Sequence, residues 1–185
     1  MVRRAFSPRN AKNCKPGLVQ THPAETPRQQ ARRNQRGRRE YARLLCGMLG
    51  HEYWALTFSR GRCLDLDLRQ YAWHLFLTRI RQEWPTAQAW TTYEYRPRRG
   101  VHLHAIIKGV PGFTPQWAQY IVALLADGTQ IHVEKSRGDA EFHARYLTKQ
   151  LTDPKYVDQW PRHCRVVSVT RGWCPDWHRE RPTSR

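Results

Sequence analysis

Residues 101–108 read VHLHAIIK, a pattern that indicates a β-strand with one apolar face and one face that carries two histidines. Side chains of a β-strand point alternately to opposite faces. Val, Leu, Ala and Ile therefore share one face, which suits packing against helices, while His102 and His104 share the other. Their Cβ atoms lie about 7 Å apart, since each residue advances a strand by about 3.3 Å. Two imidazoles at this spacing can bind one metal ion.

A third candidate ligand comes from the preceding strand. If Tyr95 pairs with Val101 at the hairpin, Glu94 lies opposite His102 on the histidine face. Two histidines and one carboxylate leave coordination positions open for substrate, which is typical of a catalytic metal site. If the register differs, Glu134 is the next candidate. The alternative is a pair of histidines that only solvate an exposed sheet face.

Hydrophobic periodicity alternates between strand and helix along the rest of the chain. The expected order is strand, helix, strand, strand, helix, strand, followed by one more helix and one more strand. This order predicts an α+β fold with a ferredoxin-like or RRM-like antiparallel sheet. The first two helices cover one face, and the active site lies on the other, where the third helix is free to pack. The expected elements are strands 51–60, 89–96, 101–108, 130–135 and 165–170, and helices 65–84, 114–126 and 139–151.

Charge is unevenly distributed along the 185 residues, whose formal net charge is +17. Residues 1–39 contain 11 Lys or Arg and a single acidic residue. We therefore predict a basic, unfolded arm over residues 1–40, a folded domain over 41–173 and a polar tail over 174–185. Such a charge favours a polyanionic partner, above all nucleic acid, although a merely basic protein is the alternative.

Membrane insertion and secretion are not expected. The longest apolar run, 120–126, is far shorter than the ~20 residues that a membrane span requires, and no apolar segment follows the N-terminus. The five cysteines are odd in number and irregularly spaced. We interpret them as reduced thiols and predict a cytoplasmic location.

Helix 139–151 contributes a candidate nucleophile. Tyr146 and Lys149 occupy positions i and i+3, so they share one side of the helix. A tyrosine hydroxyl needs help to ionise near neutral pH, and a neighbouring ammonium can stabilise the phenolate or pair with a phosphate. This pair suits attack on a phosphodiester, although a tyrosine that only packs is the simpler interpretation of the helix alone.

Three segments in this order resemble the motifs of one known family. They are HEYWALTFSR (51–60), GVHLHAIIKG (100–109) and ARYLTKQLTD (144–153). Together they are similar to motifs one to three of the HUH endonucleases, specifically the rolling-circle replication initiators of small phages, plasmids and circular single-stranded DNA viruses. The second and third motifs are specific as an ordered pair.

The resemblance implies roles for individual residues. His102 and His104 match the metal-binding pair, and Glu94 lies near the usual place of the third ligand. Tyr146 matches the nucleophile that cuts one DNA strand and keeps its 5′ phosphate, and Lys149 matches the accessory lysine. The implied cofactor is Mg²⁺ or Mn²⁺, and the implied substrate is single-stranded or locally melted origin DNA.

The resemblance also sorts the subclass. Where two-tyrosine initiators carry their second tyrosine, this chain has Phe142 and Gln150, so it resembles the single-tyrosine enzymes. No GxxxxGK[ST] motif is present, and we expect the helicase and polymerase to come from the host. A bacterial cytoplasm is expected, with a eukaryotic nucleus left open.

Three alternatives remain open at this stage. Single-tyrosine transposases share the same motif order. A non-catalytic, ferredoxin-like nucleic-acid-binding module would require aromatic residues on the open sheet face. A zinc-stabilised protein would use His163, Cys164, Cys174 and His178.

At the hairpin tip, Arg96, Arg98 and Arg99 are expected to contact DNA phosphates.

Overall fold

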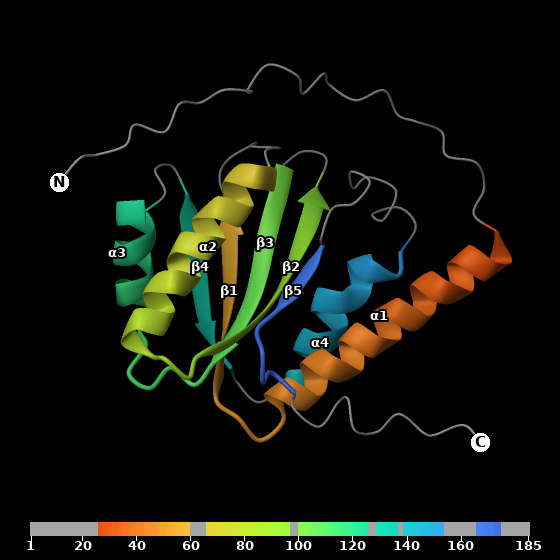
Figure 1. Ribbon diagram of the computed structural model, residues 1–185, viewed down its shortest axis with the longest axis horizontal. Helices are drawn as coiled ribbons and strands as arrows, with labels where there is room; N and C mark the ends of the chain where they lie inside the picture. The colour runs from red at the N-terminus through yellow and green to blue at the C-terminus, as the bar shows by residue number, and fades with distance from the viewer. Residues whose placement is uncertain are drawn as a thin grey trace, which may run out of the picture.

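The computed structural model describes residues 26–59, 66–96, 100–125, 129–136, 139–153 and 166–174. Its centre is a five-stranded antiparallel sheet in the order β4-β1-β3-β2-β5 (Figure 1). Because β3 lies between β1 and β2, the β1-α2-β2-β3-α3-β4 portion has the ferredoxin-like arrangement, and the predicted α+β fold class is confirmed. The elements are α1 (Pro27–Met48), β1 (Tyr53–Ser59), α2 (Leu66–Glu83), β2 (Gln88–Arg96), β3 (Gly100–Lys108), α3 (Pro115–Leu125), β4 (Gln130–Lys135), α4 (Ala140–Thr148), the 3₁₀ turn η1 (Lys149–Leu151) and β5 (Val167–Val169).

The β2–β3 register is the one predicted from the hairpin. Glu94 pairs with His102, and Thr92 pairs with His104. On the other side of β3, Thr57 of β1 is the cross-strand partner of His104. Side chains that are directly opposite share a face of the sheet. The register therefore gathers polar residues from three strands on one side of the sheet.

Helices α2 and α3 cover the first sheet face, as expected. Apolar side chains of β1 and β3 pack there against an aromatic layer that includes Phe76 of α2 and Trp117 of α3. Helix α3 begins as the sequence predicts, because Thr114 accepts a hydrogen bond from the Trp117 backbone N–H (3.1 Å). The strand residues in this core include Leu56, Phe58, Tyr93, Val101, Leu103, Ala105 and Ile107.

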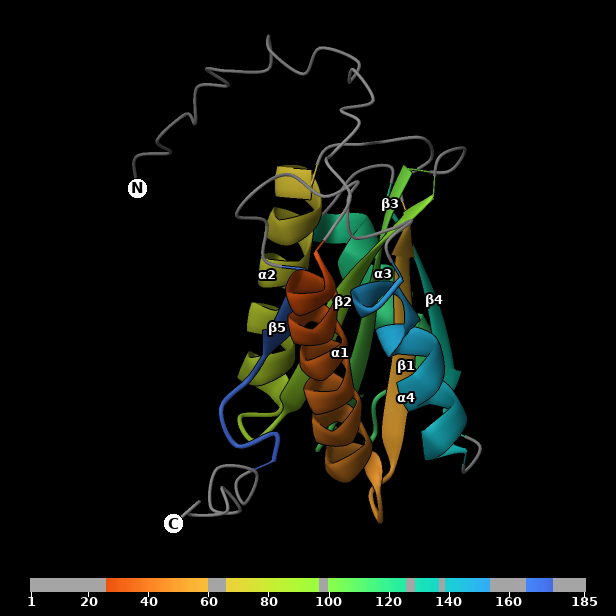
Figure 2. The same ribbon diagram turned by 90° about the vertical axis from the view of Figure 1, so that its right-hand side faces the viewer.

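The second sheet face is covered by α1 and α4. Figure 2 shows these two helices side by side in front of the strands. Trp90 and Ile106 from the sheet are completely buried against Leu44 of α1 and Ala144 of α4. The expected open face is therefore a second core over part of its area, and the polar residues occupy the remainder.

Helix α1 differs from the expected unfolded arm, because it already begins at Pro27. Thr26 and Gln29 form a capping box, in which the Gln29 backbone N–H donates to Thr26 Oγ1 and the Thr26 N–H donates to Gln29 Oε1. Pro27 at the first helical position suits this start. The buried Leu44 and Met48 then attach the helix to the sheet. The remainder of the predicted arm, residues 1–25, lies outside the described residues, as does the tail from 175 onward.

Two glycines allow α1 to approach its neighbours closely. A Cβ atom built on Gly37 would overlap the Thr152 side chain beyond η1, and one built on Gly47 would overlap the indole of Trp173. The Trp173 indole N–H donates to the Arg43 carbonyl of the same helix (3.1 Å). Glycine within a helix costs about 1 kcal/mol relative to alanine, so its presence here is explained by packing.

Within the described segments, no helix combines the length and the apolar character that a membrane crossing requires. Of the described cysteines, Cys46 is exposed and Cys174 is a half-buried free thiol. Cys14, Cys63 and Cys164 lie outside the described residues.

We predict that Gly47→Ala destabilises the fold although alanine is the better helix former. The added methyl group displaces Trp173 from its pocket on α1, and overpacking of this kind costs about 1–3 kcal/mol. Urea unfolding followed by tryptophan fluorescence measures the loss. Gln35→Ala, at an exposed position of the same helix, is the control and should not lower stability. Equal stability of the two variants would contradict the packing account.

Candidate active site

Four of the residues singled out in the sequence line one small pocket. Glu94 comes from β2, His104 from β3, Tyr146 from α4 and Lys149 from η1. The pocket lies on the second sheet face, where α4 packs across the strands. Thr92, Tyr93 and Leu147 complete its lining.

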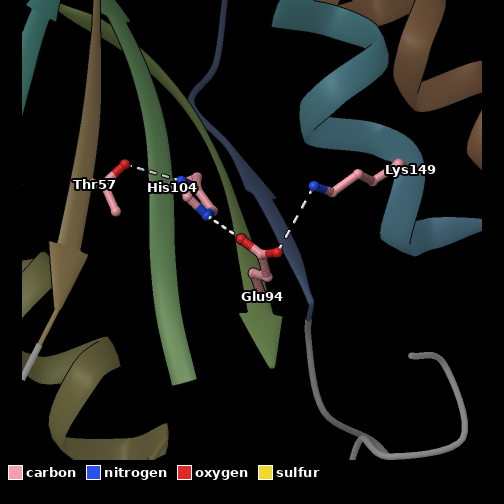
Figure 3. A network of polar contacts seen from close by, with 4 residues as sticks. All are labelled: Thr57, Glu94, His104 and Lys149. Carbon is pink, nitrogen blue, oxygen red and sulfur yellow. Dashed lines mark hydrogen bonds and ion pairs between the residues drawn. The ribbon is translucent and has the colours of Figure 1, made fainter. Parts of the chain in front are cut away.

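Glu94 and His104 form the polar centre of this pocket. The Glu94 carboxylate lies 2.7 Å from Nε2 of His104, and both residues are buried. On the other side of the ring, Nδ1 of His104 lies 3.0 Å from the Thr57 hydroxyl (Figure 3). A bare Nε2 lone pair would repel the carboxylate, so Nε2–H donates to Glu94, and the Thr57 hydroxyl donates to Nδ1. Three neighbouring strands thus orient one imidazole.

Lys149 connects this pair to the tyrosine. Its Nζ lies 3.8 Å from the second carboxylate oxygen of Glu94 and 3.6 Å from the centroid of the Tyr146 ring. The Tyr146 ring in turn meets His104 edge to face, with the centroids 6.0 Å apart. Ammonium groups over aromatic faces are attracted by the ring quadrupole. The predicted i, i+3 pair therefore faces the predicted carboxylate and histidine.

The start of α4 determines where this pair lies. Asp139 caps the helix by accepting a hydrogen bond from the Phe142 backbone N–H (2.8 Å). The apolar side of the helix, which includes Ala144 and Leu147, is buried against the sheet. After Thr148 the helix tightens into η1, and Lys149 is the first residue of this tighter turn. This geometry directs Lys149 toward Glu94, as Figure 3 shows.

The structure brings together two of the three expected metal ligands. Glu94 is directly opposite His102 in the register, but its carboxylate reaches diagonally to His104. No group of three His, Cys, Asp or Glu side chains among the described residues is arranged to hold a metal ion. Glu134, the alternative ligand, instead contacts His132 on the edge strand β4 (2.9 Å).

The donor chemistry of the Glu94–His104 pair nevertheless fits a hard divalent cation. A carboxylate oxygen and an imidazole nitrogen face each other at the wall of a pocket and belong to the ligand types that Mg²⁺ and Mn²⁺ accept. Thr57 holds the imidazole from behind, as partners of metal-binding histidines commonly do. A cation bound at Nε2 would require the ring proton to reside on Nδ1, where the Thr57 hydroxyl can accept it.

Most of the residues predicted to contact DNA phosphates or to bind zinc lie outside the described residues. Arg96 is the last residue of β2, but its side chain is not described, and Arg98 and Arg99 lie outside the described residues. Of the alternative zinc set, only Cys174 is described, as a half-buried free thiol. The phosphate contacts of the three arginines and the alternative zinc site therefore stay predictions.

Two features of the site were not predicted. Phe142 is 59% exposed and stacks on Tyr146, with 19° between the ring planes. Thr92 is buried in the pocket lining, and its hydroxyl makes no hydrogen bond to the described residues. The i, i+4 spacing of Phe142 and Tyr146 could have indicated that the two rings stack. The cross-strand pairing of Thr92 with His104 could have indicated that Thr92 lines the pocket.

Comparisons with known proteins add little to this geometry. No protein-family model matches the chain, and no curated protein is similar to it in sequence. The chain is similar to the crystal structure of the hypothetical protein ORF119 from Sulfolobus islandicus rod-shaped virus 1, with a TM-score of 0.43 and 12% sequence identity over 58% of this chain and 90% of that chain. A likeness this distant carries no functional argument, so the site is interpreted from its own residues.

We predict that Thr57→Val lowers stability by about 1–2 kcal/mol, because Nδ1 of His104 loses its partner in a largely buried place. Valine keeps the shape and the strand propensity of threonine. Urea unfolding measures the change, and ¹⁵N NMR of the His104 ring should report a new tautomer balance. Thr78→Val, on the exposed side of α2, is the control. A His104 spectrum that is unchanged by Thr57→Val would contradict the assigned hydrogen bond.

Proposed function

We propose that this protein cuts and rejoins single-stranded DNA through a tyrosine nucleophile, as the initiator of rolling-circle replication. The observation that carries the proposal is the convergence of Tyr146, Lys149, Glu94 and His104 on one pocket. These residues come from separate segments of the chain, and each was selected from the sequence for the same reaction. An accidental cluster would not be expected to combine the nucleophile, its cationic neighbour and two of the three expected metal ligands.

The reaction needs only the exchange of one phosphodiester bond for another. The Tyr146 hydroxyl loses its proton and attacks the phosphorus, and the bond from phosphorus to the 3′ oxygen breaks. The leaving 3′ oxygen takes up a proton, and the 5′ phosphate stays on the tyrosine. A free 3′-OH can later attack this ester, which restores the DNA backbone and the Tyr146 hydroxyl without ATP.

The residues around Tyr146 divide the remaining work. Lys149, already 3.6 Å from the centroid of the tyrosine ring, is positioned to stabilise phenolate character and to pair with the scissile phosphate. Glu94 and His104 are the residues that would hold Mg²⁺ or Mn²⁺, with His102 on the same strand face. When bound, such a cation supplies charge neutralisation at the phosphate.

Lys149 faces two competing anions in this scheme. Its Nζ lies 3.8 Å from the Glu94 carboxylate, which makes the contact a weak one. The Lys149 side chain is 41% exposed. A phosphate that approaches the exposed side of Lys149 from solvent can take the ammonium from Glu94. This exchange would free the carboxylate for a cation at the moment when substrate binds.

The substrate class follows from the same chemistry, and the host partners from the resemblance to replication initiators. The substrate is single-stranded or locally melted origin DNA, and the helicase and polymerase come from the host. One tyrosine allows one covalent cycle at a time, because Phe142 has no hydroxyl group. A single-tyrosine transposase would use the same site, and the DNA sequence that is cut distinguishes the two.

We predict that Tyr146→Phe abolishes strand cleavage and retains DNA binding. Phenylalanine preserves the contacts with Phe142 and His104 and removes only the hydroxyl group. Cleavage of end-labelled random single strands with Mn²⁺ measures the first effect, and fluorescence anisotropy measures the second. Tyr120→Phe, an exposed tyrosine on α3, is the matched control and should cleave normally. Full cleavage by Tyr146→Phe would show that Tyr146 is not the nucleophile.

A second prediction concerns the cation. Glu94→Gln and His104→Ala should each weaken Mn²⁺ binding at least about tenfold, in the range seen for lost ligands and their partners. Isothermal titration of the DNA-free protein measures this directly and does not depend on cleavage. His132→Ala, on the exposed edge strand β4, is the control. Unchanged Mn²⁺ affinity in both site variants would place the cation elsewhere.

A further inference from the structure

Five arginines recur along α1 at spacings of four, four, three and four residues. They are Arg28, Arg32, Arg36, Arg39 and Arg43. At 3.6 residues per turn, this pattern places all five within about 80° of the helix circumference. With a rise of 1.5 Å per residue, the row extends over about 22 Å along a single helix. We name these five residues the arginine row.

The arginine row lies on the outer side of the helix. Gly37, Leu44 and Met48, which attach α1 to the rest of the fold, are buried on the opposite side. Arg28, Arg32, Arg36 and Arg39 are exposed, and Arg43 is half-buried at the end of the row. The row is therefore held in a fixed direction by a packed helix, which an unfolded basic arm could not achieve.

Nearby acidic groups do not neutralise the row. Within the part of the chain that the structure describes, these five arginines make no ion pair. Glu40 of the same helix accepts a hydrogen bond from the Trp90 indole (3.4 Å). Glu141, on the adjacent α4, accepts from Tyr41 and forms an ion pair with Arg145. The row thus presents concentrated positive charge that no described acidic group pairs with.

The shape of the row favours duplex DNA over a single strand. Surfaces for single strands combine positive charge with aromatic side chains on which bases stack. Among the described residues, the exposed outer side of α1 carries arginines, Gln35 and Cys46 but no aromatic ring. The exposed Phe142 and the half-buried Tyr146 on which it stacks lie instead at the candidate active site. A straight row of guanidinium groups suits phosphates that are themselves rigidly arranged.

We infer that the arginine row of α1 binds the phosphate backbone of duplex DNA, independently of sequence, beside the site that receives the single strand. The inference rests on the proposed function for the choice of DNA over other polyanions. It gives the protein two surfaces of different chemistry. The arginine row holds the unmelted flank, and the surface around Tyr146 and Lys149 receives the melted strand.

The test replaces the four exposed arginines together, as Arg28→Gln, Arg32→Gln, Arg36→Gln and Arg39→Gln. Glutamine keeps helix propensity close to that of arginine. The control variant removes the same charge from exposed positions outside the row, as Arg38→Gln, Arg79→Gln, Arg81→Gln and Arg171→Gln. Fluorescence anisotropy of the full chain without divalent metal measures binding to a short duplex, a thymidine single strand and an RNA duplex over a range of salt concentrations.

The row variant should bind duplex DNA at least about tenfold more weakly than the control variant. Its log–log salt slope for the duplex should also become shallower by about 3.6, if each arginine contacts one phosphate. Binding of the thymidine strand should change equally in the two variants. Equal duplex affinities of the two variants would overturn the inference, as would a larger loss on the single strand or tighter binding of the RNA duplex.

These outcomes are separable from the fate of the proposed function. The binding assay contains no cleavage step, so an inactive nuclease that still loses duplex affinity in the row variant would support the arginine row and contradict the nicking proposal. Conversely, normal cleavage with unchanged duplex binding would contradict the arginine row alone.

Discussion

The Glu94–His104 contact is the interaction on which the rest of the site depends. A buried carboxylate is costly unless other groups compensate its charge. Here one carboxylate oxygen accepts from His104, and the other faces the Lys149 ammonium. These partners come from β3 and η1, so the β2–β3 register and the position of α4 must both be correct. A register slip of one residue would turn Glu94 to the opposite face of the sheet, into the aromatic core.

One face of the sheet carries the main hydrophobic core, and the other carries the candidate active site. On the first face, α2 and α3 bury a continuous apolar and aromatic layer. On the second, α1 and α4 bury a smaller core around Trp90 and leave the polar pocket beside it. Helix α1 contributes to this division twice, because its inner side secures α4 and its outer side carries charge. The glycines at 37 and 47 make the close packing of the inner side possible.

Sequence reasoning succeeded where a local pattern determines the structure. Strand alternation in 101–108 assigned His104 to its face, and the hairpin at 97–100 fixed Glu94 opposite His102, as the structure confirms. The N-cap at Asp139 and the buried apolar side of α4 also follow from local sequence patterns. The helical start at Pro27 was missed because arginine-rich composition outweighed a short capping signal. The contact between α1 and Trp173 joins residues far apart in the chain, and no local pattern encodes it.

The diagonal reach of Glu94 shows a second limit of sequence reasoning. Register alone pairs Glu94 with His102, yet the carboxylate contacts His104, two residues further along β3. Long side chains reach diagonal neighbours in a sheet, and the choice between them depends on Thr57 and Lys149. The Thr57 hydroxyl contacts Nδ1 of the His104 ring, and the second carboxylate oxygen of Glu94 lies 3.8 Å from Lys149 Nζ.

Peptide mapping of a covalent DNA adduct tests the central claim most directly. The full chain is incubated with random-sequence single strands and Mn²⁺, digested with nuclease and protease, and analysed by mass spectrometry. The account predicts a nucleotide linked by its 5′ phosphate to the peptide that contains Tyr146. An adduct on Tyr93, Tyr95 or Tyr156 would contradict it, and so would cleaved DNA that is joined to no tyrosine.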